Sequence, residues 1–202
     1  MTSSERLEEY FRKFPGIGSR QAKRFVYFLL SQPNGFIKEI ADTIVSLKKE
    51  VRQCEECFRF FVNGEESVCK LCKKKGDRSV LVVEKDIDLE TIEKSGTYGG
   101  RYFVLGGLVP ILEKDPPSKV RIKELVGMLE RDAKGKSLKE VILGFSLNAE
   151  GENTLQYVKK TLEPLAKKNG FKISALGRGF STGLELEYTD SDTLKNALRN
   201  RA

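Results

Sequence analysis

Apolar side chains recur every three or four positions over the first fifty residues, which is the spacing of one face of an α-helix. Three such stretches follow one another, and breaks rich in proline and glycine separate them at 15–18 and 33–35. The chain therefore opens with three predicted helices, the second of which runs to about Leu30. Their apolar stripes comprise Leu7, Tyr10, Phe11 and Phe14; Ala22, Phe25, Val26 and Leu29; and Phe36, Ile40, Ile44, Leu47 and Val51.

Short apolar runs alternate with helical patterns from residue 79 onward. The first run, 79–83, is partly β-branched and ends at Glu84, which is typical of a buried parallel strand. Strands that alternate with helices indicate an α/β fold with a mostly parallel sheet. The predicted strands are 79–83, 102–105, 140–145 and 172–176, and the predicted helices are 88–94, 121–131, 153–168 and a short basic one at 191–201.

All 4 cysteines of the chain lie in one short segment, as two C-x-x-C hooks. Such hooks bring four thiolates to one point, which is the pattern of a structural zinc site that leaves no position open for water. A pair of disulfides or four unrelated buried thiols is the alternative. The N-terminus has no secretory pattern, so we expect a reducing, cytoplasmic setting, which suits thiolate ligands. The sequence predicts one structural Zn²⁺ bound by Cys54, Cys57, Cys69 and Cys72.

Charge and composition narrow the function classes. The chain has 202 residues, a net charge of +7 and no histidine. The positive charge favours an anionic partner, nucleic acid first, over a basic protein without such a partner. The absence of histidine excludes Ser-His-Asp triads and histidine acid–base catalysis. No apolar run approaches the roughly 20 residues that cross a bilayer, so we expect no membrane partner.

The turn at 14–18 is a helix-hairpin-helix motif between two predicted helices. Its glycines allow the backbone to approach a phosphate, and the second helix presents N–H groups at its start, where we expect Ser19 to act as the N-cap. Basic side chains on the exposed face of this helix can reach a sugar–phosphate backbone. An ordinary hairpin with a solvated basic face is the alternative, but the pattern favours DNA. The predicted DNA-binding residues are Gly16, Gly18, Arg20, Lys23 and Arg24.

A second candidate site joins Glu84 to the segment 144–152. A glutamate after one strand and D-x-D-x-E-G-E after a later one is similar to the Toprim fold, in which topoisomerases and primases hold Mg²⁺ with clustered carboxylates. Here the two D-x-D positions are neutral, and the later acids also suit an ordinary helix N-terminus. We therefore expect a Toprim shape without Toprim catalysis. The residues of this vestigial acidic site are Glu84, Ser146, Asn148, Glu150 and Glu152.

Taken in order, these motifs resemble the bacterial RecR family of recombination mediators over nearly the whole chain. The resemblance implies a DNA-repair protein without enzymatic activity that assembles into a ring-like tetramer through swapped N- and C-terminal regions. It also implies that the protein works with RecO or RecF to load RecA onto single-stranded DNA coated by SSB. It matches Arg20 and Arg24 to DNA contacts and the four cysteines to zinc ligands. The resemblance rests on 14–18, the two cysteine hooks, 82–84, 100–107, 150–152 and 186–188.

The predicted fold class is α/β with four parts. We expect a helix-hairpin-helix DNA-binding domain at 1–53 and a four-cysteine zinc finger at 54–77. A Toprim-like parallel α/β sheet follows at 78–175, and a short helical segment at 176–202 serves assembly.

Three functions compete at this level. The first is a non-enzymatic DNA-binding clamp in recombinational repair, a homo-oligomer that acts with RecO or RecF. The second is a Mg²⁺-dependent Toprim nuclease or primase, which the two neutral D-x-D positions, Ser146 and Asn148, disfavour. The third is a zinc-stabilised scaffold that binds only proteins, which a salt-dependent gel shift with DNA distinguishes from the first.

Overall fold

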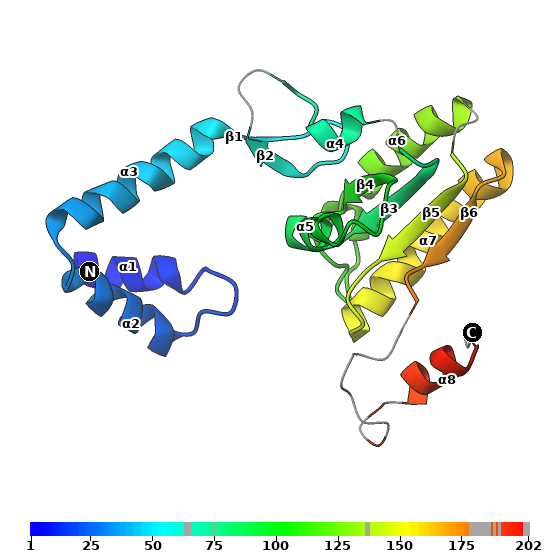
Figure 1. Cartoon of the computed structure of the whole chain (residues 1–202). Helices are drawn as coiled ribbons and strands as arrows, with labels where there is room; N and C mark the ends of the chain where they lie inside the picture. The colour runs from blue at the N-terminus through cyan, green and yellow to red at the C-terminus, as the bar shows by residue number, and fades with distance from the viewer. Residues whose placement is uncertain are drawn as a thin grey trace. The chain divides into compact units, whose positions relative to one another are not determined.

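The chain forms two compact units, Met1–Arg52 and Gln53–Ala202. The structure is a computed structural model (Figure 1). It describes residues 1–62, 66–74, 76–135, 138–177, 187, 189 and 191–199.

The N-terminal unit is helical, as predicted. Helix α1 (Ser3–Phe11) packs against α2 (Ser19–Leu30), and α3 (Asn34–Glu50) follows. Ala22 and Val26 of α2 are buried, and the rings of Phe11 and Phe25 meet edge to face with their centroids 5.5 Å apart. No side chain of α3 is buried, although its sequence has an apolar stripe.

The start of α2 corrects one prediction. The N-cap is Gly18, and Ser19 is already the first helical residue. The Gly18 carbonyl accepts the first helical hydrogen bond, from the Ala22 N–H at 2.9 Å. Ser19 was predicted as the N-cap because serine is a preferred residue at that position. In the structure the extended backbone of Gly18 ends the turn one residue earlier, so Gly18 is the N-cap.

The larger unit is built around a four-stranded parallel sheet with strand order β4-β3-β5-β6. Three helices accompany it, and Figure 1 shows the strands alternating with them along the chain. This confirms the predicted α/β layer. The elements are β3 (Ser79–Val83), α5 (Asp86–Ser95), β4 (Arg101–Val104), α6 (Ile122–Lys134), β5 (Glu140–Gly144), α7 (Ala149–Asn169) and β6 (Lys172–Ala175), with a 3₁₀ turn at Pro116–Ser118.

The core lies on both faces of this sheet. Successive side chains of a strand point to opposite faces, so β3 supplies Val80 and Val82 to one cluster and Leu81 and Val83 to the other. Helices α6 and α7 cover the first face, and α5 covers the second with Leu89. The central strand is therefore buried on both sides, which explains its continuous apolar sequence.

Smaller elements flank the sheet. The cysteine segment contains β1 (Val51–Gln53) paired with β2 (Phe60–Val62), and the short helix α4 (Lys70–Lys73). Helix α8 (Ser191–Arg199) lies near the C-terminus, within the predicted 191–201. Much of the predicted assembly segment at 176–202, and two of the three residues at 186–188, lie outside the described residues. In the described part of the chain, no helix has the length and apolarity that a membrane span requires.

Candidate functional site

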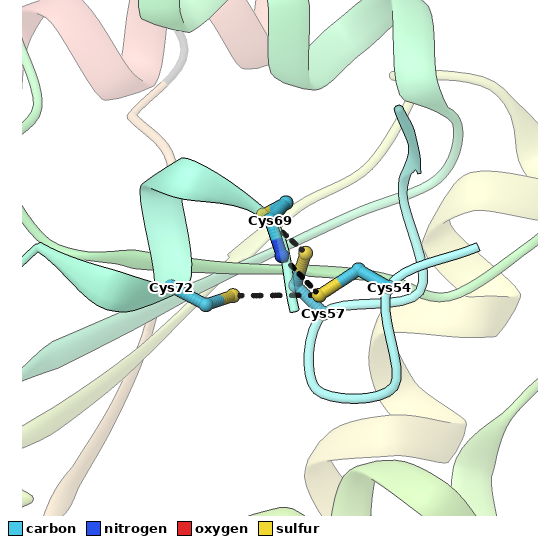
Figure 2. A group of neighbouring side chains, drawn as sticks. All are labelled: Cys54, Cys57, Cys69 and Cys72. Carbon is cyan, nitrogen blue, oxygen red and sulfur yellow. Dashed lines mark hydrogen bonds between the residues drawn. The ribbon is translucent and has the colours of Figure 1, made fainter. Parts of the chain in front are cut away.

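The two cysteine hooks converge on one point. Cys54 and Cys57 belong to the turn after β1, Cys69 is the N-cap of α4, and Cys72 lies within that helix. Figure 2 shows the four side chains directed toward one another, and their sulfur atoms all lie within 4.8 Å of one another. Three of the four cysteines are buried. This cluster could hold a metal ion.

The sulfur–sulfur distances match a metal centre better than disulfides. Cys57 Sγ lies 3.6 Å from Cys69 Sγ, and Cys54 Sγ lies 3.9 Å from Cys72 Sγ. Sulfurs placed at the corners of a tetrahedron about 2.3 Å from one ion are about 3.8 Å apart. A disulfide would bring two sulfurs to about 2.05 Å, and all four cysteines are free. The disulfide interpretation and that of four unrelated thiols are therefore both wrong.

Hydrogen bonds within the cluster favour ionisation of one thiol. Hydrogen bonds from the thiols of Cys57 and Cys72 lower the pKa of Cys69 to about 2. Hydrogen bonding to Cys69 in turn raises the pKa of Cys57, and hydrogen bonding to Cys57 raises the pKa of Cys72. The Cys69 backbone N–H also donates to Cys54 Sγ at 3.3 Å. The protons that these sulfurs share are the ones that a bound cation would displace.

The lobe that carries the cluster is attached to the sheet beside it. The Val104 N–H, at the end of β4, donates to the Cys57 carbonyl oxygen at 2.8 Å. The next residue, Phe58, has a φ of 61° and packs its ring on Phe103, with the centroids 5.4 Å apart. The Arg121 guanidinium lies over the Phe58 ring, with its central carbon 5.6 Å from the ring centroid. A non-glycine residue with positive φ is uncommon, and here packing into the core holds it in place.

The hairpin between α1 and α2 presents an open turn and a basic helix face. Gly16 has a φ of +77°, a conformation that favours glycine. A Cβ atom at Gly16 or Gly18 would meet nothing within 4 Å, so the turn is open on the outside. Arg20, Lys23 and Arg24 are exposed on α2, opposite the buried Ala22 and Val26. The predicted basic and apolar faces of this helix are thus as expected.

The carboxyl ends of the parallel strands bring together part of the predicted acidic site. Glu84 follows β3 and is buried, with 5% of its surface exposed. Its Oε2 accepts a hydrogen bond from Ser146 Oγ at 2.8 Å, across 62 residues of sequence. Asn148 instead caps α7, because its Oδ1 accepts from the Gly151 N–H at 2.7 Å.

The remaining acids do not complete a carboxylate cluster. Glu150 is exposed, and Glu152 accepts a hydrogen bond from the Gln156 amide at 3.0 Å. Within the described ranges, the four cysteines are the sole group of three or more His, Cys, Asp and Glu side chains close enough to share a metal ion. The residues after β3 and β5 therefore do not fit the Mg²⁺ that the Toprim layout implies.

Sequence reasoning missed the residue next to Glu84. Lys85 places its Nζ 2.5 Å from Glu84 Oε1, and the carboxylate raises the pKa of this lysine. A lysine directly after a strand-ending glutamate is the available signal, but neighbouring side chains of an extended chain ordinarily diverge. They meet here because Lys85 is the N-cap of α5, where the chain turns from strand to helix.

The fold and the sites define a Toprim-domain protein with a separate helical unit and a four-cysteine centre. The family model described as the Toprim domain matches residues 78–177. Over nearly the full chain, the sequence is similar to proteins named recombination protein RecR. These include those of Bdellovibrio bacteriovorus (32% identical, 100% of this chain and 97% of the relative), Chlorobium phaeobacteroides (34%, 98% and 95%) and Chloroherpeton thalassium (36%, 98% and 95%).

The chain therefore belongs to the RecR family. RecR proteins are recombination mediators in DNA repair and are not known as enzymes. The nuclease or primase alternative is not favoured.

Proposed function

We propose that this chain acts as a DNA-binding clamp in recombinational repair, and that the first contacts with DNA come from the hairpin between α1 and α2. The observation that carries the proposal is the exposed set Arg20, Lys23 and Arg24 beside the open turn at Gly16 and Gly18. Positive side chains near a helix N-terminus bind phosphates without reading base sequence. Affinity for DNA falls steeply with salt, because bound counterions are released.

Charge reversal tests the DNA interface. Arg20→Glu with Arg24→Glu is expected to lower DNA affinity at least tenfold in a gel-shift or anisotropy titration. Removing the two charges as alanines should reduce the salt slope by about two, one for each phosphate contact. Lys159→Glu with Lys160→Glu, both exposed on α7, is the matched control with the same change in net charge. Equal binding by the hairpin variant and the wild type would contradict the proposed interface.

The four cysteines support one structural Zn²⁺, in the reducing environment of the cytoplasm. Four sulfur ligands suit Zn²⁺ among the common ions and leave no coordination position for substrate. Elemental analysis of the purified chain should give one zinc per chain. Cys72→Ser, which removes the least buried ligand, should lower the zinc content, and a full complement of iron in place of zinc would refute the assignment.

Self-assembly has support in the apolar surface of the N-terminal unit. Tyr27, Leu30, Ile44, Val45 and Leu47 are each more than half exposed. Apolar groups gathered on a small helical unit mark an interaction surface. We propose that other copies of the chain cover it, in the ring-like tetramer that the family resemblance implies.

Light scattering at micromolar concentration tests the assembly. The wild type is expected to run as a tetramer, and Ile44→Asp with Leu47→Asp should reduce the mass while circular dichroism of the larger unit persists. Lys48→Asp with Lys49→Asp, on the same helix, is the control. A wild-type chain that stays monomeric with and without DNA would make the clamp untenable.

For partners, we propose RecO or RecF-type mediator proteins and a role in loading RecA onto single strands coated by SSB. Support comes from membership of the RecR family. Purified RecO or RecF should co-elute with the chain, and the mixture should speed RecA filament formation on SSB-coated strands. Absence of both effects with both partners would refute this part of the proposal.

A further inference from the structure

The buried Glu84 carboxylate has both of its oxygens occupied by its own chain. Oε2 accepts from Ser146 Oγ at 2.8 Å, and Oε1 lies 2.5 Å from Lys85 Nζ. The Glu84 side chain is 6% exposed, while that of Lys85 is 63% exposed. The lysine thus places its ammonium group at the carboxylate while most of its side chain stays exposed.

Such a carboxylate needs a positive partner. Removing one member of a buried, paired charge leaves the other uncompensated, which costs far more than an exposed ion pair contributes. In a carboxylate cluster that holds a divalent metal, the metal is that partner. At this edge of the sheet, the two D-x-D positions supply no metal ligand, because Ser146 is neutral and the Asn148 side-chain oxygen caps α7.

We propose that Lys85 supplies, from within the chain, the positive charge that a divalent ion supplies at a complete carboxylate edge, and thereby closes this edge to divalent cations. The ammonium and the Ser146 hydroxyl together occupy both oxygens through which Glu84 would bind a metal. The protein thus keeps the Toprim architecture, with the Lys85 ammonium group in place of a metal ion. This inference concerns the larger unit alone and does not depend on the proposed DNA interface.

The test restores a second carboxylate and then removes the lysine. Four zinc-loaded full-length chains are titrated with Mn²⁺, and free Mn²⁺ is followed by electron paramagnetic resonance: the wild type, Lys85→Met, Ser146→Asp, and the double variant. The double variant is expected to bind one Mn²⁺ at least tenfold more tightly than Ser146→Asp alone. Lys94→Met in the Ser146→Asp background is the matched control, because Lys94 is an exposed lysine of α5 that pairs with Glu90.

Two outcomes overturn the proposal. One is equal Mn²⁺ affinity of the double variant and Ser146→Asp, which would mean that the lysine does not exclude the ion. The other is a wild type that binds Mn²⁺ as tightly as the double variant. If Ser146→Asp prevents folding, thermal unfolding of Lys85→Met decides instead. Millimolar Mn²⁺ should then raise its melting temperature and leave that of the wild type unchanged, and equal shifts in both would refute the idea.

Discussion

Gly151 shows how one backbone position arranges the loop that carries Ser146. It lies in the first turn of α7, and a Cβ atom there would stand 1.8 Å from the Ser146 carbonyl oxygen. The close approach keeps the loop against the helix, which in turn leaves the Ser146 hydroxyl within reach of Glu84. A side chain at position 151 would have to displace the backbone of Ser146 rather than the flexible end of a side chain.

Replacement of this glycine by alanine should therefore destabilise the larger unit by about 3 kcal/mol, at the upper end of the cost of overpacking. Gly127→Ala is the matched control within α6, where a new Cβ would make only ordinary contact with the end of the Arg131 side chain, at 3.9 Å, among the residues that the structure describes. That change should stabilise the helix by about 0.5–1 kcal/mol. Urea unfolding measures both, and a neutral Gly151→Ala would contradict the close approach.

Tyr98 makes the stability of the sheet sensitive to alkaline pH. Burial raises the pKa of Tyr98 from 10.0 to about 12, and its hydroxyl oxygen lies 3.0 Å from Ser79 Oγ and donates to the Arg101 carbonyl at 3.1 Å. The folded chain holds this proton more tightly than the unfolded chain. Its contribution to stability is therefore complete below about pH 10 and is lost as the pH rises toward about 12.

Tyr98→Phe removes the titrating group, so the free energy of unfolding should fall less steeply between about pH 10 and about pH 12. Chemical unfolding at a series of pH values gives the slope. Tyr10→Phe, on a half-exposed ring of α1, is the control for loss of a tyrosine hydroxyl elsewhere in the chain. Parallel slopes for Tyr98→Phe and the wild type would exclude Tyr98 as the source.

At the scale of elements, the start of α7 illustrates where periodicity stops being informative. The apolar pattern predicted a helix from residue 153, but α7 begins at Ala149. The first turn is set by a cap and by acids that face solvent, neither of which contributes to an apolar stripe. Asn148 supplies the cap, and Glu150 and Glu152 suit the positive end of the helix dipole.

Loss of this cap is expected to cost about 1 kcal/mol, because Asn148→Ala leaves the Gly151 N–H without its acceptor. Asn148→Asp keeps an oxygen acceptor and should retain stability within a few tenths of that value. Thermal unfolding compares the two. If both variants lost the same stability, the cap would not be the cause.

The sheet and its helices could be predicted because the spacing of apolar residues within each segment indicates a helix or a strand, and these segments pack into an ordinary apolar core. The cysteine cluster was predictable because the spacing of ligands is itself a local signal. The parallel strands also allowed the meeting of Glu84 with Ser146 to be anticipated, since the carboxyl ends of such strands share one edge. The short strands β1 and β2 and the helix α4 of the cysteine lobe were not predicted, because they have only three or four residues each and too few apolar side chains to show a periodic pattern.

At the scale of the whole molecule, the cysteine lobe and the sheet differ in what stabilises them. The sheet has a continuous apolar core, whereas the buried residues of the lobe are the cysteines themselves. Thiols must lose their protons to bind a metal, so a chelator that removes the proposed metal acts on the lobe and has no ligand to remove in the sheet.

Removal of the proposed metal should therefore unfold the lobe and spare the sheet. After chelation, amide hydrogens at Cys69 and Phe58 are expected to exchange rapidly, while those of Val82 stay protected. Hydrogen exchange read by mass spectrometry distinguishes these segments, and re-addition of Zn²⁺ is the control. Equal loss of protection in β3 would show that the two parts unfold together.

Helix α3 has a consequence for how the protein behaves on dilution. It is 17 residues long, and none of its own side chains is buried. Isolated helices near this length are marginal in water, and most helical stability in proteins comes from packing an apolar face. In the proposed assembly the partner is another copy of the chain, which binds the folded helix and not the unfolded segment, so mass action links the melting of α3 to protein concentration. If the proposed assembly forms, the helicity of the N-terminal unit should therefore fall on dilution before that of the larger unit.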